Sequence, residues 1–212
     1  MSEPRRSGVL GVLLAGGQNR RYGGEPKALA TVAGEPIAAR AVRALQAAVG
    51  RVVLVANEPH IYRPLGLEIR PDLRPGLGAL GGIHTAVAWA EEAGCRGALV
   101  TACDMPFLSA ALLERLIAGA DADEVVAPAS DSRRGMEPLC AFYGVGCRGA
   151  IEAALDRGDR HVTSFFGEVT VRTMPAEAVA EHGDPDLLFL NVNTPADRER
   201  AEAAARAAEA AG

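Results

Sequence analysis

Short apolar runs alternate with longer segments of helical periodicity along almost the whole chain, and this alternation most constrains its fold. The apolar runs are rich in Val, Leu and Ile and are bounded by Gly, Pro or polar residues, which is typical of buried strands. We predict strands at residues 8–15, 51–56, 67–70, 97–102, 124–128, 138–143, 169–174 and 187–190. We predict helices at residues 36–49, 80–93, 109–118, 146–157 and 195–211, the third of them capped by Ser109. Strands separated by helices of this length predict an α/β fold with a mostly parallel sheet covered on both faces.

The length and composition suit one globular domain that spans residues 1–212. The net charge is −5, so a basic surface broad enough for nucleic acid is not expected. We find no stretch with the length of a membrane span or the pattern of a signal peptide, which predicts a cytoplasmic protein without a membrane partner. The four cysteines form no C-x-x-C pair and no zinc-type spacing, so we expect reduced, buried thiols.

The first predicted strand leads into a loop, residues 16–27, that holds four glycines and three cations. The cations are Arg20, Arg21 and Lys27, and Lys27 is the only lysine in a chain with 21 arginines. The loop fits neither the dinucleotide-binding pattern G-x-G-x-x-G nor the P-loop pattern G-x-x-x-x-G-K-[ST]. Its glycines would still let backbone N–H groups approach an anion, and its cations would supply charge for a polyphosphate. The alternative interpretation is an ordinary turn with a surface lysine.

An aspartate follows the predicted strand at 97–102, in the sequence Thr101-Ala102-Cys103-Asp104-Met105-Pro106. Open α/β sheets bind ligands at the carboxyl ends of their strands, so we expect the Asp104 carboxylate to face the ligand. A hard oxygen ligand there suits Mg²⁺, which usually shares phosphate oxygens with the substrate. A turn or cap aspartate before Pro106 is an equally good interpretation of this motif alone.

Two of the four asparagines in the chain alternate in the sequence Asn191-Val192-Asn193-Thr194-Pro195. At the end of the strand predicted at 187–190, Asn191 and Asn193 would share one face. Helix capping is the alternative, with Thr194 or Asn193 as the N-cap and Pro195 as the first helical residue. Capping explains one asparagine and leaves the other without a role.

Together these motifs resemble those of the molybdenum cofactor guanylyltransferases, a branch of the nucleotidyltransferases. The resemblance runs from Leu14-Ala15-Gly16-Gly17 and Arg20-Arg21 to the Asn191–Pro195 motif. Between them, residues 76–83 resemble the family's Gly-Pro-Leu-Ala-Gly segment, residues 103–106 its Pro-Cys-Asp-Thr-Pro, and residues 137–139 its His-Pro-Leu. The resemblance implies a Rossmann-like three-layer nucleotidyltransferase fold with a mostly parallel sheet.

The chain departs from the family pattern in three places. Pro26 stands where the family commonly has Asp, Tyr22 stands where it has Met, and the Gly-Pro-Leu segment lacks its proline. Leu-Ala-Gly-Gly is more typical of the guanylyl branch, whereas cytidylyl relatives more often have Leu-Ala-Ala-Gly. Pro-Lys is common in the wider nucleotidyltransferase superfamily, so the departures bear on the choice of substrate more than on the type of reaction.

The resemblance also implies site residues at the matching positions of this sequence. Nucleotide-binding residues would be Leu14, Ala15, Gly16, Gly17, Lys27, Asn57, Asp72, Gly81 and Asp104. Among these, Lys27 would hold the phosphates with Arg21, Asn57 and Asp72 would lie beside the guanosine, and Asp104 would ligate Mg²⁺. Asn191 and Asn193 would line the acceptor side of the cleft. Ordinary turn chemistry is the alternative for Asn57 and Asp72, because both lie next to prolines or turn residues.

The reaction implied is attack by the terminal phosphate of molybdopterin on the α-phosphorus of GTP, with pyrophosphate leaving. Residues of about 8–106 would bind the nucleotide, and residues of about 107–212 would form the acceptor side. A transient contact with a molybdoenzyme or a cofactor-handling protein is also implied. Two alternatives remain open. One is another nucleotidyltransferase, which would use CTP with molybdopterin or act on a sugar phosphate or an isoprenoid precursor. The other is a GTP-binding module without catalysis.

Overall fold

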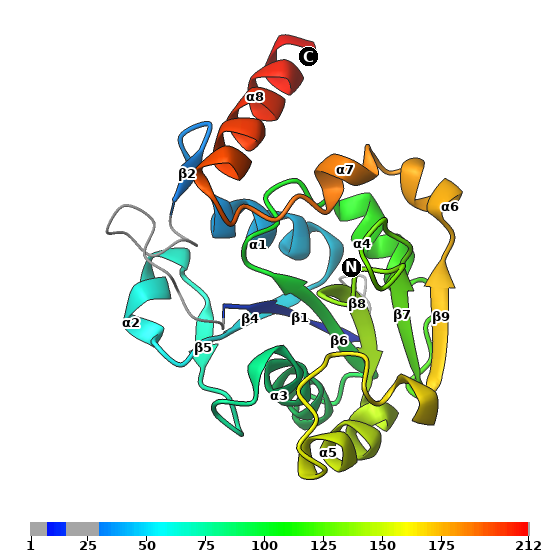
Figure 1. The fold of residues 1–212 in the computed structure, drawn as a ribbon. Coiled ribbons are helices and arrows are strands. Elements are labelled where there is room, and N and C mark those ends of the chain that lie inside the picture. The colour runs from blue at the N-terminus through cyan, green and yellow to red at the C-terminus, as the bar shows by residue number, and fades with distance from the viewer. Residues whose placement is uncertain (1–7, 16–29, 212) are drawn as a thin grey trace, which may run out of the picture.

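The computed structural model describes residues 8–15 and 30–211, which form a twisted central sheet between two layers of helices (Figure 1). The sheet has seven strands in the order β5-β4-β1-β6-β8-β7-β9. The strands are β1 (Val9–Leu14), β4 (Arg51–Val55), β5 (Glu68–Arg70), β6 (Gly97–Ala102), β7 (Glu124–Pro128), β8 (Cys140–Gly144) and β9 (Thr170–Met174). Within this sheet β8 is antiparallel to β6 and β7, and the other neighbouring pairs are parallel. The predicted α/β fold with a mostly parallel sheet is therefore confirmed.

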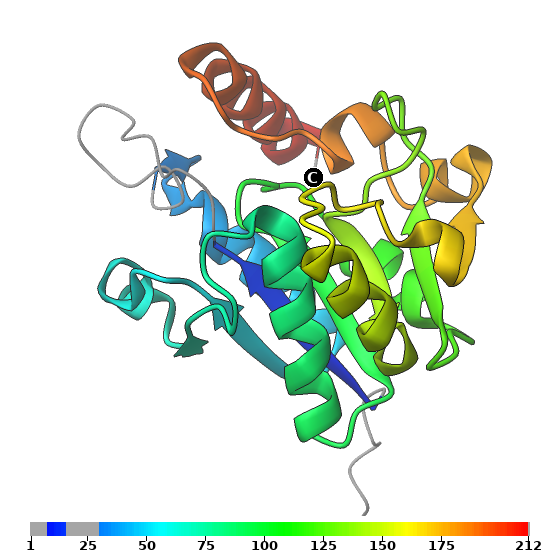
Figure 2. The same ribbon diagram turned by 60° about the horizontal axis from the view of Figure 1, so that its bottom comes forward.

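Helices cover both faces of the sheet, and the strands at its centre are apolar on both sides for this reason. Helices α1 (Ile37–Ala48) and α4 (Ala110–Ile117) pack on one face, and α3 (Gly78–Glu92) and α5 (Arg148–Asp156) on the other (Figures 1 and 2). In β1, Val9 and Leu13 belong to the core beneath α1 and α4, whereas Leu10, Val12 and Leu14 belong to the core beneath α3 and α5. Strand β1 is packed on both faces, and this packing holds its last residue, Leu14, in place at the carboxyl end of the strand.

The register of β1 brings three strand ends into one row. Leu14 pairs with Val55 of β4 on one side and with Ala102 of β6 on the other. The chain goes from β1 to one side of the sheet and returns to the other side for β6, so β1 lies at a topological switch point. Open α/β sheets bind ligands in the crevice at such a point.

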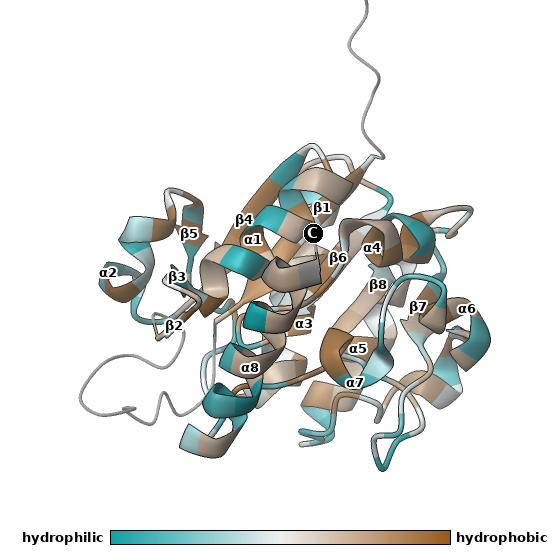
Figure 3. Ribbon diagram, turned by 90° about the horizontal axis from the view of Figure 1, so that it is seen from above, coloured by the Kyte–Doolittle hydropathy of each residue, from teal (hydrophilic) through white to brown (hydrophobic). Residues whose placement is uncertain are grey.

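The C-terminal helix α8 (Pro195–Ala211) is attached outside the main layers through a short antiparallel hairpin, β2 (Thr31–Val32) and β3 (Glu35–Pro36). Arg198 Nε donates to the carbonyl of Thr31 at 3.0 Å, and the amide of Ala33 donates to Glu202 at 3.2 Å. Figure 3 colours the strands of the sheet mostly as hydrophobic and much of α8 as hydrophilic. Among the described helices, none has both the length and the apolar character that crossing a bilayer requires.

The prediction of a strand at 187–190 is wrong, because this stretch begins inside a short helix, α7 (Pro185–Leu188). The Asp184 side chain accepts a hydrogen bond from the amide of Asp186 at 3.0 Å, and Pro185 occupies the first helical position. A capping aspartate followed by proline favours a helix start, and here it outweighs the apolar run behind it. Asn191 and Asn193 therefore do not lie on a strand end.

Several short elements were not predicted. They are the β2–β3 hairpin, helices α2 (Pro59–Tyr62) and α6 (Ala176–Ala180), and the 3₁₀ turns η2 (Arg63–Leu65), η3 (Val145–Cys147) and η4 (Phe166–Glu168). The predicted cap of α4 is confirmed, since Ser109 Oγ accepts from the amide of Leu112 at 3.2 Å.

Candidate functional site

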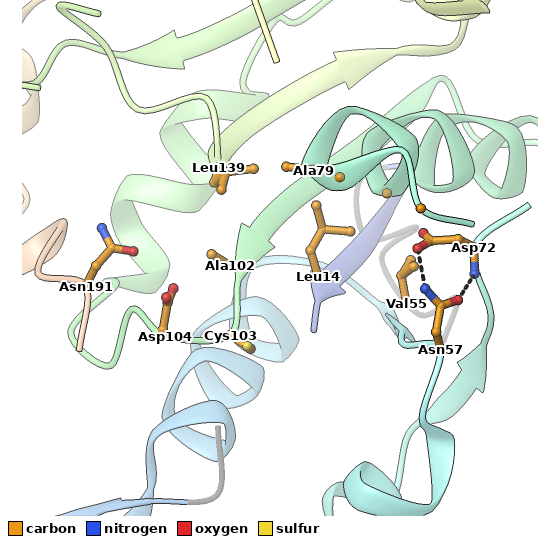
Figure 4. A pocket seen from close by; sticks show the side chains of 13 residues that line it. Leu14, Val55, Asn57, Asp72, Ala79, Ala102, Cys103, Asp104, Leu139 and Asn191 are labelled. Atoms are coloured by element: carbon orange, nitrogen blue, oxygen red, sulfur yellow. Dashed lines mark hydrogen bonds between the residues drawn. The ribbon is translucent and has the colours of Figure 1, made fainter. Parts of the chain in front are cut away.

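A cavity of about 430 Å³ opens at the carboxyl ends of β1, β4 and β6 (Figure 4). Its walls come from these strand ends, from the first turns of α3, and from the segment before α8. They consist of Leu14, Val55, Asn57, Asp72, Gly76, Gly78, Ala79, Gly82, Ala102, Cys103, Asp104, Leu139 and Asn191. Backbone hydrogen bonds hold the strand ends together at the floor of the cavity. The amide of Cys103 donates to Leu14 O at 3.1 Å, and the amide of Ala15 donates to Val55 O at 2.9 Å.

Asn57 and Asp72 form a reciprocal pair on one side of the cavity. Asn57 Nδ2 donates to Asp72 Oδ2 at 2.8 Å, and the backbone amide of Asp72 donates to Asn57 Oδ1 at 3.0 Å (Figure 4). Burial raises the pKa of the Asp72 carboxyl above its ordinary value, and the bond from Asn57 partly opposes this effect. The second oxygen, Asp72 Oδ1, is buried without a hydrogen-bond partner among the described residues. A ligand N–H group would satisfy that oxygen.

The first turn of α3 supplies the next wall. Gly76 and Gly78 have φ of 80° and 65°, a left-handed conformation that favours glycine. The N-cap residue of α3, Leu77, makes no side-chain capping hydrogen bond, so the first backbone N–H groups of α3 and the positive end of its dipole can attract an anion at the cavity. Gly82 faces the cavity, and a Cβ there would lie 3.3 Å from a Leu14 methyl and 3.8 Å from Asp72 Oδ1.

Gly81, predicted to bind the nucleotide, does not line the cavity. It is buried inside α3, where a Cβ would lie 2.9 Å from the Leu77 Cβ and 3.3 Å from the Arg74 carbonyl oxygen. Its lack of a side chain permits close packing of the helix start, whereas its neighbour Gly82 gives the ligand room. Side chains of successive helical residues point about 100° apart, so Gly82 faces the cavity and the adjacent Gly81 does not.

Asp104 lies on the opposite side of the cavity, in the turn after β6. Its backbone carbonyl accepts a hydrogen bond from the amide of Val192 at 2.9 Å, which holds the segment before α8 against this turn. Asn191 reaches the same side of the cavity (Figure 4), and its Nδ2 donates to the Phe189 carbonyl at 3.0 Å. The amide oxygen of Asn191 thus remains available beside the Asp104 carboxylate.

Asn193, predicted beside Asn191, does not line the cavity. Its backbone amide donates to Asp197 Oδ2 at 2.9 Å, and Thr194 Oγ1 accepts from the Asp197 amide at 3.2 Å. The Thr194 backbone amide also donates to Asp197 Oδ2 at 2.8 Å, so Thr194 and Asp197 form a capping box at the start of α8. Both interpretations of the Asn191–Pro195 motif therefore hold for part of it. The motif caps α8, and it also brings Asn191 to the cavity.

The other residues predicted to bind the nucleotide either do not line the cavity or lie outside the described part of the chain. Ala15 is 8% exposed and is not among the residues that line the cavity. Gly16, Gly17, Arg21 and Lys27 lie outside the described residues.

Sequence reasoning assigned no role to Val55, Cys103, Leu139 or Glu137. Leu139 follows Glu137 in the segment that resembles the His-Pro-Leu motif, and its carbonyl accepts from the Ala102 amide at 2.9 Å. Burial raises the pKa of the Glu137 carboxyl, Arg134 lowers it, and the negative charge of Asp104 raises it further. The motif was visible in the sequence, but only the structure brings Glu137 near Asp104. Within the described part of the chain, His, Cys, Asp and Glu side chains form no group of three that could hold a metal ion by themselves.

Residues 11–173 match the MobA-like NTP transferase domain family. The chain belongs to this family. A molybdenum cofactor guanylyltransferase of Desulfosudis oleivorans is 37% identical over 201 residues, which are 94% of this chain and 96% of that protein. A probable molybdenum cofactor guanylyltransferase of Pelotomaculum thermopropionicum is 36% identical over 193 residues, 91% of each chain. The crystal structure of molybdopterin-guanine dinucleotide biosynthesis protein A from Archaeoglobus fulgidus has a TM-score of 0.73 and 26% identity, and covers 94% of this chain and 100% of that chain.

The resemblance inferred from the motifs is confirmed by these matches. As a MobA-like NTP transferase the chain is a nucleotidyltransferase, and its cavity lies at the switch point of the sheet, where open α/β folds bind ligands.

Proposed function

We propose that this nucleotidyltransferase transfers GMP from GTP to the terminal phosphate of molybdopterin and releases pyrophosphate. The observation that carries the proposal is the similarity, over more than nine-tenths of both chains, to relatives named molybdenum cofactor guanylyltransferase. The cavity supports it, because carboxylate, amide and helix-terminal groups converge there from five separate segments of the chain.

The Asn57–Asp72 pair is suited to binding the guanine base. Guanine carries two adjacent donors, N1–H and the N2 amino group, and a carboxylate can accept both. Asp72 Oδ1 is the acceptor without a partner among the described residues, and Asn57 holds the carboxylate in place from the other side. Adenine lacks the N1–H donor, and cytosine presents a different edge.

The triphosphate would extend along the start of α3, where N–H groups and the helix dipole favour negative charge. We propose that Lys27 and Arg21, with the backbone of Gly16 and Gly17, complete the phosphate site. A lysine there would supply a compact ammonium on a flexible stem, which guanidinium does not replace.

A divalent metal generally assists such transfers, and the oxygens at Asp104 fit one. The Asp104 carboxylate and the Asn191 amide oxygen line the same side of the cavity. This is a small, all-oxygen set, and Mg²⁺ completes such sets with water and phosphate oxygens. When bound, Mg²⁺ would neutralise charge on the phosphates.

The protein itself needs no nucleophile for this chemistry, because the attacking phosphate is already ionised. An oxygen of the acceptor phosphate forms a bond to the α-phosphorus, the bond from that phosphorus to the bridging oxygen breaks, and pyrophosphate leaves with its electrons. The residues of this chain align the two phosphates and place positive charge beside them. Asp104 and Asn191 lie where the two substrates would meet.

The test is a transfer assay with molybdopterin, Mg²⁺ and each of GTP, CTP, ATP and UTP in turn. We expect pyrophosphate and the guanine dinucleotide form of the cofactor with GTP. Transfer from CTP in preference to GTP would place this chain with the cytidylyl enzymes, and nucleotide binding without any transfer would contradict catalysis.

Three further proposals come from the sequence. Residues 1–212 would form one domain, with the nucleotide half at about 8–106 and the acceptor half at about 107–212. The protein would act in the cytoplasm without binding nucleic acid or membranes. It would make a transient contact with the molybdoenzyme, or the cofactor-handling protein, that receives the product.

A further inference from the structure

A second cavity, of about 340 Å³, adjoins the nucleotide cavity on its acceptor side. Asn191 lines both cavities and so lies between them. The second cavity is formed by the loop between β7 and β8 and by the segment from α7 to α8. Its lining includes Ser130, Ser132, Glu137, Phe189, Asn191 and Arg200.

The polar side chains of this second cavity mostly offer acceptors, because their donors are used within the protein. Ser130 Oγ donates to Ser132 Oγ at 2.9 Å, and Ser132 Oγ donates to the Met136 carbonyl at 2.7 Å. Asn191 uses one N–H of its Nδ2 on the Phe189 carbonyl, and its amide oxygen is an acceptor. A ligand that fits this wall must therefore supply N–H or O–H donors.

Glu137 is the least exposed of the three carboxylates that line the second cavity. Its only hydrogen bond from a described backbone group to the carboxylate is a long one, 3.3 Å from the Leu139 amide to Oε1. The carboxylate is half-buried beside the charge of Asp104, and its raised pKa reflects the cost of keeping it ionised there. A ligand with two parallel N–H donors would remove much of that cost.

We propose that the second cavity holds the pterin ring of the acceptor, with the Glu137 carboxylate accepting from the ring's 2-amino group and N3–H. This inference rests on the proposed function, which supplies a pterin as the acceptor. The 2-amino-4-oxo edge presents two donors side by side and one carbonyl, and Arg200 is the cation in the lining that can donate to that carbonyl. Phe189 and Pro185 supply apolar surface for the flat ring.

The charges of the second cavity argue against an anion as its main occupant. Three carboxylates line it, those of Asp131, Glu137 and Asp186, against the single guanidinium of Arg200. The terminal phosphate of the acceptor would instead extend past Asn191 toward Asp104. This direction places the two reacting phosphates at the junction of the cavities.

The experiment compares two small probes, pterin and lumazine, by fluorescence titration of the full chain. Lumazine carries a carbonyl in place of the 2-amino group, so it lacks one donor of the pair. We expect pterin to bind at least about tenfold more tightly than lumazine to the wild type, and Glu137→Gln to reduce this ratio to below about threefold. Glu114→Gln, the same chemical change at an exposed residue of α4 outside both cavities, should keep the wild-type ratio.

A second measurement separates this inference from the proposed function. In the transfer assay Glu137→Gln should raise the KM for molybdopterin at least about tenfold and leave the KM for GTP within about twofold. Equal binding of the two probes to the wild type would overturn the proposal, as would a fall in kcat without a change in the KM for molybdopterin. If no GMP transfer occurs but pterin still binds through Glu137, the proposed function fails and the pterin site stands.

Discussion

Replacing Asp72 by Asn should weaken GTP binding while leaving the protein as stable as before or slightly more stable. Asp72 Oδ2 already accepts from Asn57 at 2.8 Å, and an amide oxygen in its place can keep that bond. The new NH₂ group would then occupy the position of Oδ1, where the guanine N–H donors need an acceptor. Losing a hydrogen bond to a charged acceptor costs about 1.5–3 kcal/mol, so the Kd for GTP should rise roughly 10- to 150-fold.

The sign of the stability effect follows from the raised pKa of Asp72. A carboxyl whose pKa is higher in the folded than in the unfolded state contributes its stability below the unfolded pKa, and this stability is lost as the pH rises through the folded pKa. Burial is the larger cause of the shift at Asp72, so the ionised form is the less favourable one at neutral pH. Asp72→Asn removes this penalty, and its advantage over the wild type should shrink as the pH is lowered toward 4.

Calorimetric titration with GTP and thermal unfolding at several pH values measure the two effects. Asn57→Ala is the contrasting variant, because it removes both bonds of the pair, including the one to the Asp72 backbone amide, and should lower both stability and affinity. A GTP affinity of Asp72→Asn within about threefold of wild type, or a fall in Tm beyond about 3 °C, would refute the reasoning, since the latter corresponds to about 1 kcal/mol in a chain of this size.

Three further outcomes are expected. Lys27→Arg should lower the transfer rate sharply although the charge is kept, and steady-state rates alongside Lys27→Ala check this; a rate within about threefold of wild type, under 1 kcal/mol of barrier, would contradict the need for an ammonium. Asp104→Asn should unfold like the wild type in a melting curve yet lose activity across a titration of Mg²⁺, and unfolding of the variant instead would make Asp104 a structural residue. GTP should bind at least about tenfold more tightly than CTP or ATP by calorimetry, and equal affinities would remove the basis for a guanine site.

The sequence was most informative where local chemistry and tertiary position coincide. Leu14, Asn57, Asp72 and Asp104 each lie at or beyond the end of a predicted strand, and parallel strands bring such residues to one edge of the sheet. The structure places all four around one cavity. Their roles in binding stay predictions until the variants above are measured.

Prediction from the sequence was less successful where one local signal outweighed another, or where tertiary packing alone determines the structure. The four apolar residues at 187–190 have no distinguishing period, and the capping sequence Asp184-Pro185 determines the helix there. Gly81 and Gly82 are adjacent in α3, and only the packing of the helix, with Gly81 against Leu77 and Gly82 against Leu14, shows which of them faces the cavity. The hairpin of β2 and β3 is too short to show a period, and its turn places Ala33 at φ 50°.

One backbone hydrogen bond joins the two segments that meet at the junction of the cavities. The Val192 amide donates to the Asp104 carbonyl at 2.9 Å, so the turn after β6 and the segment before α8 hold each other in place. In the proposed reaction Asp104 would belong to the nucleotide side through β6, and Asn191 to the acceptor side through α7 and α8. Since the two substrates must meet at a single phosphorus atom, an error of about 1 Å between these segments could lower the rate about 100-fold. The capping box of Thr194 and Asp197 begins three residues after Asn191, at the start of α8, so it constrains the backbone on which Asn191 lies.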